Sequence, residues 1–420
     1  MSLDKTLTKS KQLTLSAFSI ALLAMSGSQM ASAGVNESIE NALKFGQDDA
    51  KYGQIKFDLR YRFEQDDSKN PGLDKGDAST VRLRLGYLTP EFHGLQGYAE
   101  YETNQDFGAN TYNSRRNGKG GYQTIVDPQE HELNQLWLSY KGLADTEIKV
   151  GRQRIKLDND RFIGNVGWRQ LEMTYDSVLV TNKSLANTTV KVGYINQAQT
   201  IHSFVQPMQT PFLNVAYNFE GYGKLTGYSY LIDNNEASAS SNQTYGVSFV
   251  GKTKVTDDVK AHYRLEYAYQ KDYENNPNQY EADYFHIVGG ASAFGVTAKV
   301  GIEQLDGVGA SQGFQTPLAT GHAFNGWADQ FLTTPADGLR DVYALITGKV
   351  HGVKLLGVYH EFSDDTGSMD YGKEWNFLVS KKFGKHYSVL AKYAYFDSNT
   401  ASGNFRFDTQ NFWLQAGVHF

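Results

Sequence analysis

Three short segments carry residue types that could do chemistry. His131-Glu132-Leu133-Asn134-Gln135 begins like the zinc motif in which two histidines four residues apart share a helix face, but Gln135 stands in the second histidine position. Gly118-Lys119 lies in a glycine-rich stretch but lacks the earlier glycine spacing and the following Ser or Thr of a phosphate-binding loop. No Ser, His and acidic residue come together as nucleophile, base and orienting group. The sequence therefore predicts no catalytic site, no metal site and no cofactor.

A second group of residues indicates binding rather than catalysis. In the segment 55–64, charged residues occupy every second position: Lys56, Asp58, Arg60, Arg62 and Glu64. Guanidinium groups are fork-shaped donors that match carboxylates, so a row of them could pass an anionic chain from one to the next. The alternative is that the wall of any water-filled lumen is polar and that opposite charges across it merely pair. Both interpretations remain open from the residues alone.

The positions between these charges are apolar: Ile55, Phe57, Leu59, Tyr61 and Phe63. A period of two is typical of a β-strand with one face in water and the other against hydrocarbon. Eighteen such segments begin near positions 53, 79, 94, 132, 145, 172, 188, 211, 222, 243, 258, 281, 294, 340, 352, 371, 386 and 407. The fold class predicted is all-β, a closed antiparallel transmembrane β-barrel of 18 strands.

By this parity the inward charges form a defined set. The basic members are Lys56, Arg60, Arg62, Arg82, Arg84, Arg264 and Lys299, with Arg152, Arg154, Arg161 and Arg169 around one loop. The acidic members are Asp58, Glu100, Glu102, Asp158, Glu266 and Glu303.

The connections between segments alternate short and long along the chain. Transmembrane barrels have short periplasmic turns and long outer loops, so the alternation places both termini in the periplasm. The longest connection, 306–339, is expected to fold into the lumen as a constriction. The last strand ends on Phe420, a terminal aromatic that resembles the signal by which outer-membrane barrels engage their assembly machinery.

Composition agrees with a strand-rich protein, since 27 Tyr, 24 Phe and 41 Gly stand against only 8 Pro. Residues 1–33 have the basic, apolar and small-residue regions of a secretory signal peptide, with cleavage expected after Ala33. Of the 40 basic and 46 acidic residues, three Lys and one Asp lie in positions 1–33, which leaves a net charge of −8. That balance argues against nucleic acid as a partner. There is no cysteine to form disulfides.

The expected organisation is a signal peptide over 1–33, a short periplasmic segment over 34–51 and the barrel over 52–420. The segment 34–51 could be a short helix, a plug or a disordered chain end. The expected location is the Gram-negative outer membrane, with its lipid as a partner. A monomer is favoured.

Several stretches resemble the alginate export porin family: Gly151-Arg152-Gln153-Arg154-Ile155, Gly167-Trp168-Arg169-Gln170, and Phe57-Asp58-Leu59-Arg60-Tyr61-Arg62-Phe63-Glu64. The resemblance extends over nearly the whole chain after residue 33. It implies an eighteen-stranded outer-membrane barrel whose electropositive constriction passes polyuronate. It also implies candidate selectivity residues, Arg60, Arg82, Arg152, Arg154, Arg161, Arg169 and Arg264, with Asp158 and Glu172 as orienting partners.

The function expected is a passive channel for anionic solutes, with acidic oligo- or polysaccharides such as alginate as the solute class. The first alternative is a general diffusion porin without saccharide preference. An enzyme embedded in an outer-membrane barrel is the third. Replacement of Arg152 and Arg154 by Gln separates the first two, because only the anionic-saccharide channel should lose its selectivity.

Overall fold

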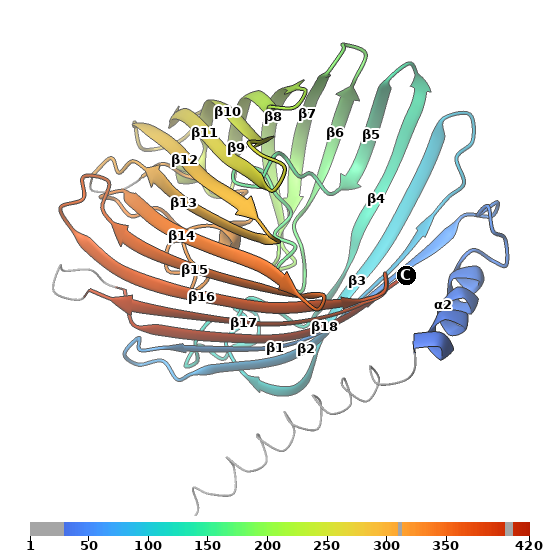
Figure 1. Ribbon diagram of the computed structural model, residues 1–420, viewed down its shortest axis with the longest axis horizontal. Coiled ribbons are helices and arrows are strands. Elements are labelled where there is room, and N and C mark those ends of the chain that lie inside the picture. The colour runs from blue at the N-terminus through green and yellow to red at the C-terminus, as the bar shows by residue number, and fades with distance from the viewer. Residues whose placement is uncertain (1–28, 310–312, 400–405) are drawn as a thin grey trace, which may run out of the picture.

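The computed structural model describes residues 29–309, 313–399 and 406–420, and they form one closed antiparallel β-barrel (Figure 1). The predicted signal peptide falls largely on residues 1–28, outside the described residues. The strands are β1 (Gln54–Ser68), β2 (Gly76–Leu88), β3 (Leu95–Thr111), β4 (Glu130–Leu143), β5 (Thr146–Gln153), β6 (Thr174–Asn182), β7 (Thr188–Gln199), β8 (Val205–Phe219), β9 (Gly223–Asn234), β10 (Asn242–Lys254), β11 (Val259–Asp272), β12 (Glu281–Ala293), β13 (Val296–Leu305), β14 (Leu339–Val350), β15 (Val353–Ser363), β16 (Asp370–Phe383), β17 (Tyr387–Ser398) and β18 (Thr409–His419).

The predicted count of eighteen strands is confirmed. Each strand pairs with its neighbour in sequence, and β1 closes the barrel against β18 with Arg60 opposite Gly417. Closure leaves no unpaired sheet edge, which is required in the hydrocarbon of a membrane because no water is present there to bond free backbone groups. Most strands begin within three residues of the predicted positions. The exception is β8, which starts at Val205 because it continues through Pro207 and Pro211, residues that normally argue against a strand interior.

At one rim of the barrel every connection has two to six residues. At the other rim the three longest connections lie, 112–129, 154–173 and 306–338, together with two short ones, 200–204 and 364–369. The expected alternation of short and long connections is therefore present around most of the barrel and is lost at 183–187 and 200–204, which are equally long.

The alternation of faces also matches the sequence pattern. Leu85, Leu138, Val300, Ile346 and Phe377 are exposed on the outside of the wall. The intervening positions point inward, where Arg62, Glu102 and Trp413 are almost fully buried. No helix within the described ranges is long and apolar enough to cross a membrane.

What buries the inward positions is a pair of loops that fold into the lumen. Ile163 of the 154–173 loop forms a parallel bridge with Leu318 of the 306–338 loop, and the Gly164 N–H donates to the Leu318 carbonyl at 2.9 Å. Phe162 packs on wall tyrosines, with Tyr284 at 5.5 Å between ring centroids. Phe331 packs on Phe362 at 4.5 Å. The expectation that the 306–339 connection folds into the lumen is confirmed, and the two loops form one apolar core with the wall.

The helix α2 (Gln29–Leu43) lies at the short-turn rim, beside the barrel (Figure 1). Glu40 contacts Nε2 of His386 at 2.6 Å and Nζ of Lys385 at 2.6 Å, both in the β16–β17 turn. Tyr387 donates its hydroxyl to Asn36 at 2.7 Å. These contacts hold α2 near the C-terminal end of the barrel.

Candidate functional site

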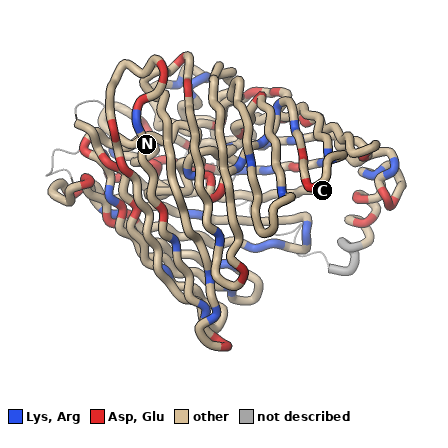
Figure 2. Tube along the Cα trace, turned by 90° about the horizontal axis from the view of Figure 1, so that it is seen from above, with Lys and Arg blue, Asp and Glu red and all other residues tan. Residues whose placement is uncertain are grey.

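Basic and acidic residues are interspersed around the barrel (Figure 2). Most of the arginines predicted as site residues do not face open water. They tie the inward loops to the wall, in a layer that we call the anchored layer and define by Arg60, Arg62, Arg84, Arg154, Arg161 and Arg169.

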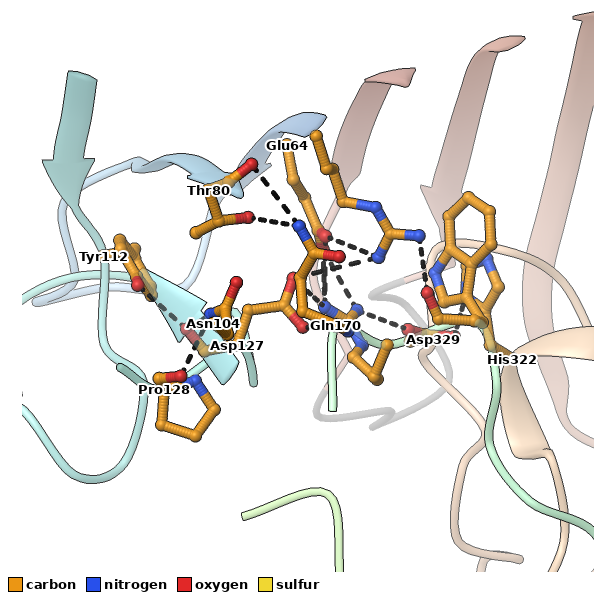
Figure 3. Close-up of polar contacts among 12 residues, drawn as sticks. Glu64, Thr80, Asn104, Tyr112, Asp127, Pro128, Gln170, His322 and Asp329 are labelled. Carbon is orange, nitrogen blue, oxygen red and sulfur yellow. Dashed lines mark hydrogen bonds and ion pairs between the residues drawn. The ribbon is translucent and has the colours of Figure 1, made fainter. Parts of the chain in front are cut away.

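Arg169 lies at the centre of this layer. Its guanidinium contacts Glu64 of β1 at 3.0 Å, Asp127 of the 112–129 loop at 3.8 Å and Asp329 of the 306–338 loop at 3.7 Å. Figure 3 shows Glu64 and Asp329 on opposite sides of this cluster. One buried guanidinium therefore joins three loops and one strand, and carboxylates from three directions raise its pKa above the usual value although burial lowers it.

Gln170, the next residue, also holds the 154–173 loop in place. Its amide donates to Oγ1 of Thr80 at 2.8 Å, and its backbone N–H donates to Asp127 at 2.8 Å (Figure 3). Asp127 is held in turn, because Tyr112 and Asn104 donate to its carbonyl at 2.9 and 3.1 Å. A dense hydrogen-bond network of this kind specifies one position for the loop.

Glu172 attaches the 154–173 loop to the wall at a second point. It accepts from Nε of Arg154 at 2.5 Å, lies 3.5 Å from Arg84, and accepts from Asn134 at 2.6 Å. Burial alone would raise the pKa of Glu172, but the two guanidinium groups outweigh it and lower the pKa to about 2. Glu172 thus contacts two of the predicted arginines, Arg84 and Arg154.

Arg60 and Arg62 hold the backbone of the same loop. Arg60 donates to the side chain of Gln170 at 2.8 Å and to the Gly167 carbonyl at 3.1 Å. Arg62 lies over the ring of Trp168 at 4.1 Å. These donors satisfy loop carbonyls that would otherwise be buried without partners.

Three predicted residues have other partners. Arg161 pairs with Glu303 at 2.9 Å, Arg264 with Glu266 at 2.9 Å, and Arg82 with Asp58. Asp158 does not orient an arginine in the described part of the chain; it pairs with Lys224 at 2.8 Å and accepts from Asn214 at 2.7 Å.

Arg152 does not lie with the arginines that face the lumen. It pairs across the sheet with Asp176, in line with Val150 and Val178, which are exposed on the outside of the barrel. Its guanidinium binds both oxygens of Asp176, at 2.7 and 3.0 Å. The strand register thus places Arg152 on the outward face.

A buried lysine that the sequence did not single out joins the two inward loops to β17. Nζ of Lys392 lies 4.3, 3.7 and 5.3 Å from the rings of Trp168, Trp327 and Trp413 and 2.6 Å from Nε2 of His322. Indole faces attract a cation, and they do so more strongly when water is excluded. Burial lowers the pKa of His322 to about 3, so His322 is neutral and can accept from Lys392.

Two inward lysines, Lys252 of β10 and Lys299 of β13, keep exposed surface. A cavity of about 700 Å³ lies against β9 to β14. Its basic lining, which we call the basic vestibule, consists of Lys224, Lys252, His262, Arg264 and Lys299. In the described ranges neither Lys252 nor Lys299 has an acidic partner within 4.0 Å. Lys299 was identified from parity; Lys252 was missed, although the same parity on β10 places it inward.

Among the described residues no group of three or more His, Cys, Asp or Glu side chains could hold a metal ion. The arrangement provides charge and shape along a wall, which is suited to binding and passing solutes.

The sequence model named alginate export matches residues 51–318. A comparison with curated proteins found no match. Among solved structures, Pseudomonas aeruginosa OccK9 (OpdG) is 14% identical with a TM-score of 0.70, covering 88% of this chain and 98% of that one. P. aeruginosa OpdK with vanillate is 13% identical with a TM-score of 0.69, covering 87% and 98%. A BenF-like porin from Pseudomonas fluorescens Pf-5 is 16% identical with a TM-score of 0.69, covering 88% and 99%. At these identities the likeness shows the fold, an outer-membrane porin barrel.

Proposed function

We propose that this chain, which belongs to the alginate export family, passively passes acidic oligo- or polysaccharides such as alginate. The premise of the proposal is that the protein is an outer-membrane channel and not an enzyme. The short-turn rim is then periplasmic and the long-loop rim extracellular.

The observation that carries the proposal is the basic vestibule. Lys252 is exposed and Lys299 partly exposed, and neither is neutralised by an acid in the described structure. Lys224 and Arg264 keep one acidic partner each, so the lining retains positive charge. Unpaired cations in a water-filled passage raise the local concentration of anions without fixing them in one tight site, which is what conduction requires.

The predicted arginines divide into two roles under this proposal. Arg154 has both roles, because it holds the loop through Glu172 while its side chain keeps 32% of its accessible surface, and Arg264 acts on the solute directly. Five other arginines act by holding the inward loops, which set the width of the passage: Arg60, Arg62, Arg84, Arg161 and Arg169. Arg82 stays paired with Asp58.

Block of single-channel current tests the solute class. Oligomers of mannuronate added to the purified channel in a planar bilayer should reduce the ionic current, whereas neutral oligosaccharides of equal length should not. The variant Lys252→Gln/Lys299→Gln should weaken the block by about tenfold, since each of the two lost charges is worth about 0.7 kcal/mol at about 6 Å in a water-like dielectric. The matched control is Lys271→Gln/Lys381→Gln, which removes the same charge from the outward face of the wall, in line with the exposed Tyr267 and Val379.

The second candidate is a general diffusion porin without saccharide preference, favoured by the many ion pairs that neutralise the anchored layer. It predicts equal block by charged and neutral oligosaccharides and no effect of the lysine double variant. That result would remove the acidic-saccharide proposal and leave the barrel unaffected.

Three further expectations accompany the proposal. The signal peptide is removed after Ala33, which N-terminal sequencing of the exported protein would test. The strand ending on Phe420 engages the barrel assembly machinery, so deletion of Phe420 should reduce the folded protein in the outer membrane. The channel is a monomer, which mass measurement in detergent would test.

A further inference from the structure

The outward face of β14 to β17 carries a charged cavity of about 580 Å³ near the extracellular ends of these strands. Two cations line it, Arg340 and Lys373, together with the carboxylates of Glu361, Asp370 and Asp397. The strand register places Glu361 opposite Lys373, and Lys373 opposite Asp397. This face is outside the lumen, so the proposed transport function makes no use of these residues.

The two cations of this cavity are not committed to the carboxylates. No ion pair within 4.0 Å joins Arg340 or Lys373 to an acid in the described ranges, and Nε of Arg340 is buried without a hydrogen-bond partner. Asp370 accepts from Asn399 at 2.9 Å, and Glu361 accepts from Tyr359 at 2.8 Å. The cavity therefore has cationic donors available beside carboxylates that can accept from hydroxyl groups.

An apolar hollow of about 770 Å³ continues from this cavity toward the middle of the wall. Tyr359 lines both. The outward floor of the hollow is formed by small residues, including Gly289, Ala344 and Gly357. Trp375 forms a side of it, in contact with Tyr359 at 4.4 Å between ring centroids.

The dimensions suit one lipid leaflet. The four residue steps from Arg340 to Ala344 correspond to about 13 Å along a strand. The apolar band of an outer-membrane barrel is ~25 Å tall, so this distance is close to half of it. A lipid with its head group at Arg340 and Lys373 would lay an acyl chain in the hollow.

We propose that this outward face of β12 to β17 binds a phosphorylated glycolipid of the outer leaflet. Arg340 and Lys373 hold its phosphate, and Glu361 and Asp397 accept from its sugar hydroxyls. The hollow between Gly289 and Trp375 holds one acyl chain. A simple phospholipid fits less well, because it offers few hydroxyl groups to the carboxylates. The proposal rests on the fold alone and does not depend on the solute of the channel.

Native mass spectrometry of the purified channel tests the head-group part. The probe is a bis-phosphorylated, hexa-acylated glucosamine disaccharide, and the comparison lipids are its dephosphorylated form and phosphatidylglycerol. The wild-type channel should retain the phosphorylated probe in preference to both. The variant Arg340→Gln/Lys373→Gln should bind it at least about tenfold more weakly, because two charged donors are lost. Equal retention of all three lipids, or equal binding by the variant, would overturn the proposal.

A pair of glycine variants tests the acyl-chain part. A Cβ at Gly289 would meet no atom within 4 Å, so Gly289→Leu fills the hollow without distorting the strand. Gly227 is an outward glycine of β9 with equally open surroundings, and Gly227→Leu is the matched control. Only Gly289→Leu should weaken binding of the probe. If Gly289→Leu instead dissociates a dimer of the channel, the hollow belongs to a second copy and the lipid proposal is wrong.

Discussion

The anchored layer and the basic vestibule differ in what their cations contact. In the anchored layer each guanidinium has a carboxylate or backbone carbonyls within hydrogen-bond distance, as Arg169 has with Glu64 at 3.0 Å. In the basic vestibule Lys252 and Lys299 have no such partner in the described part of the chain. The same residue types therefore serve two purposes. Paired, buried cations fix the position of the inward loops, whereas unpaired, hydrated cations remain available to a solute.

The largest effect on the position of the inward loops is expected from replacing Arg169, which contacts three carboxylates. Arg169→Gln leaves Glu64, Asp127 and Asp329 buried without their shared cation, which should cost about 3–5 kcal/mol in the attachment of the loop. Limited proteolysis of the folded barrel should then cut the 154–173 loop, which stays protected in the wild type. Arg115→Gln, at an exposed position of the 112–129 loop, is the control. Equal protection of both variants would mean that the ion pairs do not hold the loop.

A smaller effect is expected when Arg152 and Arg154 are replaced separately. Arg154→Gln removes a cation of the 154–173 loop from the lumen and should lower the relative anion permeability by about fivefold, equivalent to about 1 kcal/mol. Arg152→Gln should leave ion selectivity unchanged, because Arg152 pairs with Asp176 on the outward face. Reversal potentials of the two variants measure this. A comparable change in both would contradict the assignment of faces.

The smallest effect is expected from pH. The pKa of Glu172 is lowered to about 2 from 4.5, so its contribution to holding the loop is complete above about pH 4.5 and is lost as the pH falls toward 2. The part of the single-channel conductance that depends on Glu172, taken as the difference between the wild type and Glu172→Gln, should be constant from pH 7 to pH 5 and change only below that range. Glu172→Gln should remove the change. A transition above pH 5 that disappears in Glu172→Gln would show that Glu172 is less strongly paired than the geometry indicates.

The strands could be predicted from the sequence because lipid and water impose a period of two on every one of them. In β1, the alternation from Ile55 to Glu64 gives both the strand and its inward face. Prediction failed where a residue was grouped by its nearness in sequence to a loop and not by its parity. Arg152 was assigned to the lumen with the arginines around the 154–173 loop, although β5 pairs with β6 without a register shift and its parity with the exposed Val150 places Arg152 on the outward face.

The contacts of the anchored layer could not be predicted for a different reason. Arg169 and Glu64 are 105 residues apart, and only the path of a loop brings them together. The same holds for the three tryptophans around Lys392, which come from two loops and a strand. The sequence around a single lysine in an alternating strand does not indicate whether its side chain is buried away from water. Sequence parity therefore identifies inward charges, but it does not separate paired cations from free ones.

The reversal potential of the purified channel under a salt gradient tests the account most directly. The account predicts anion selectivity in the wild type and a fall of about tenfold in the anion-to-cation permeability ratio in Lys252→Gln/Lys299→Gln. The outward-face control Lys271→Gln/Lys381→Gln should behave as the wild type. A cation-selective wild type, or a lysine double variant with unchanged reversal potential, would contradict the claim that the unpaired cations of the basic vestibule select the solute.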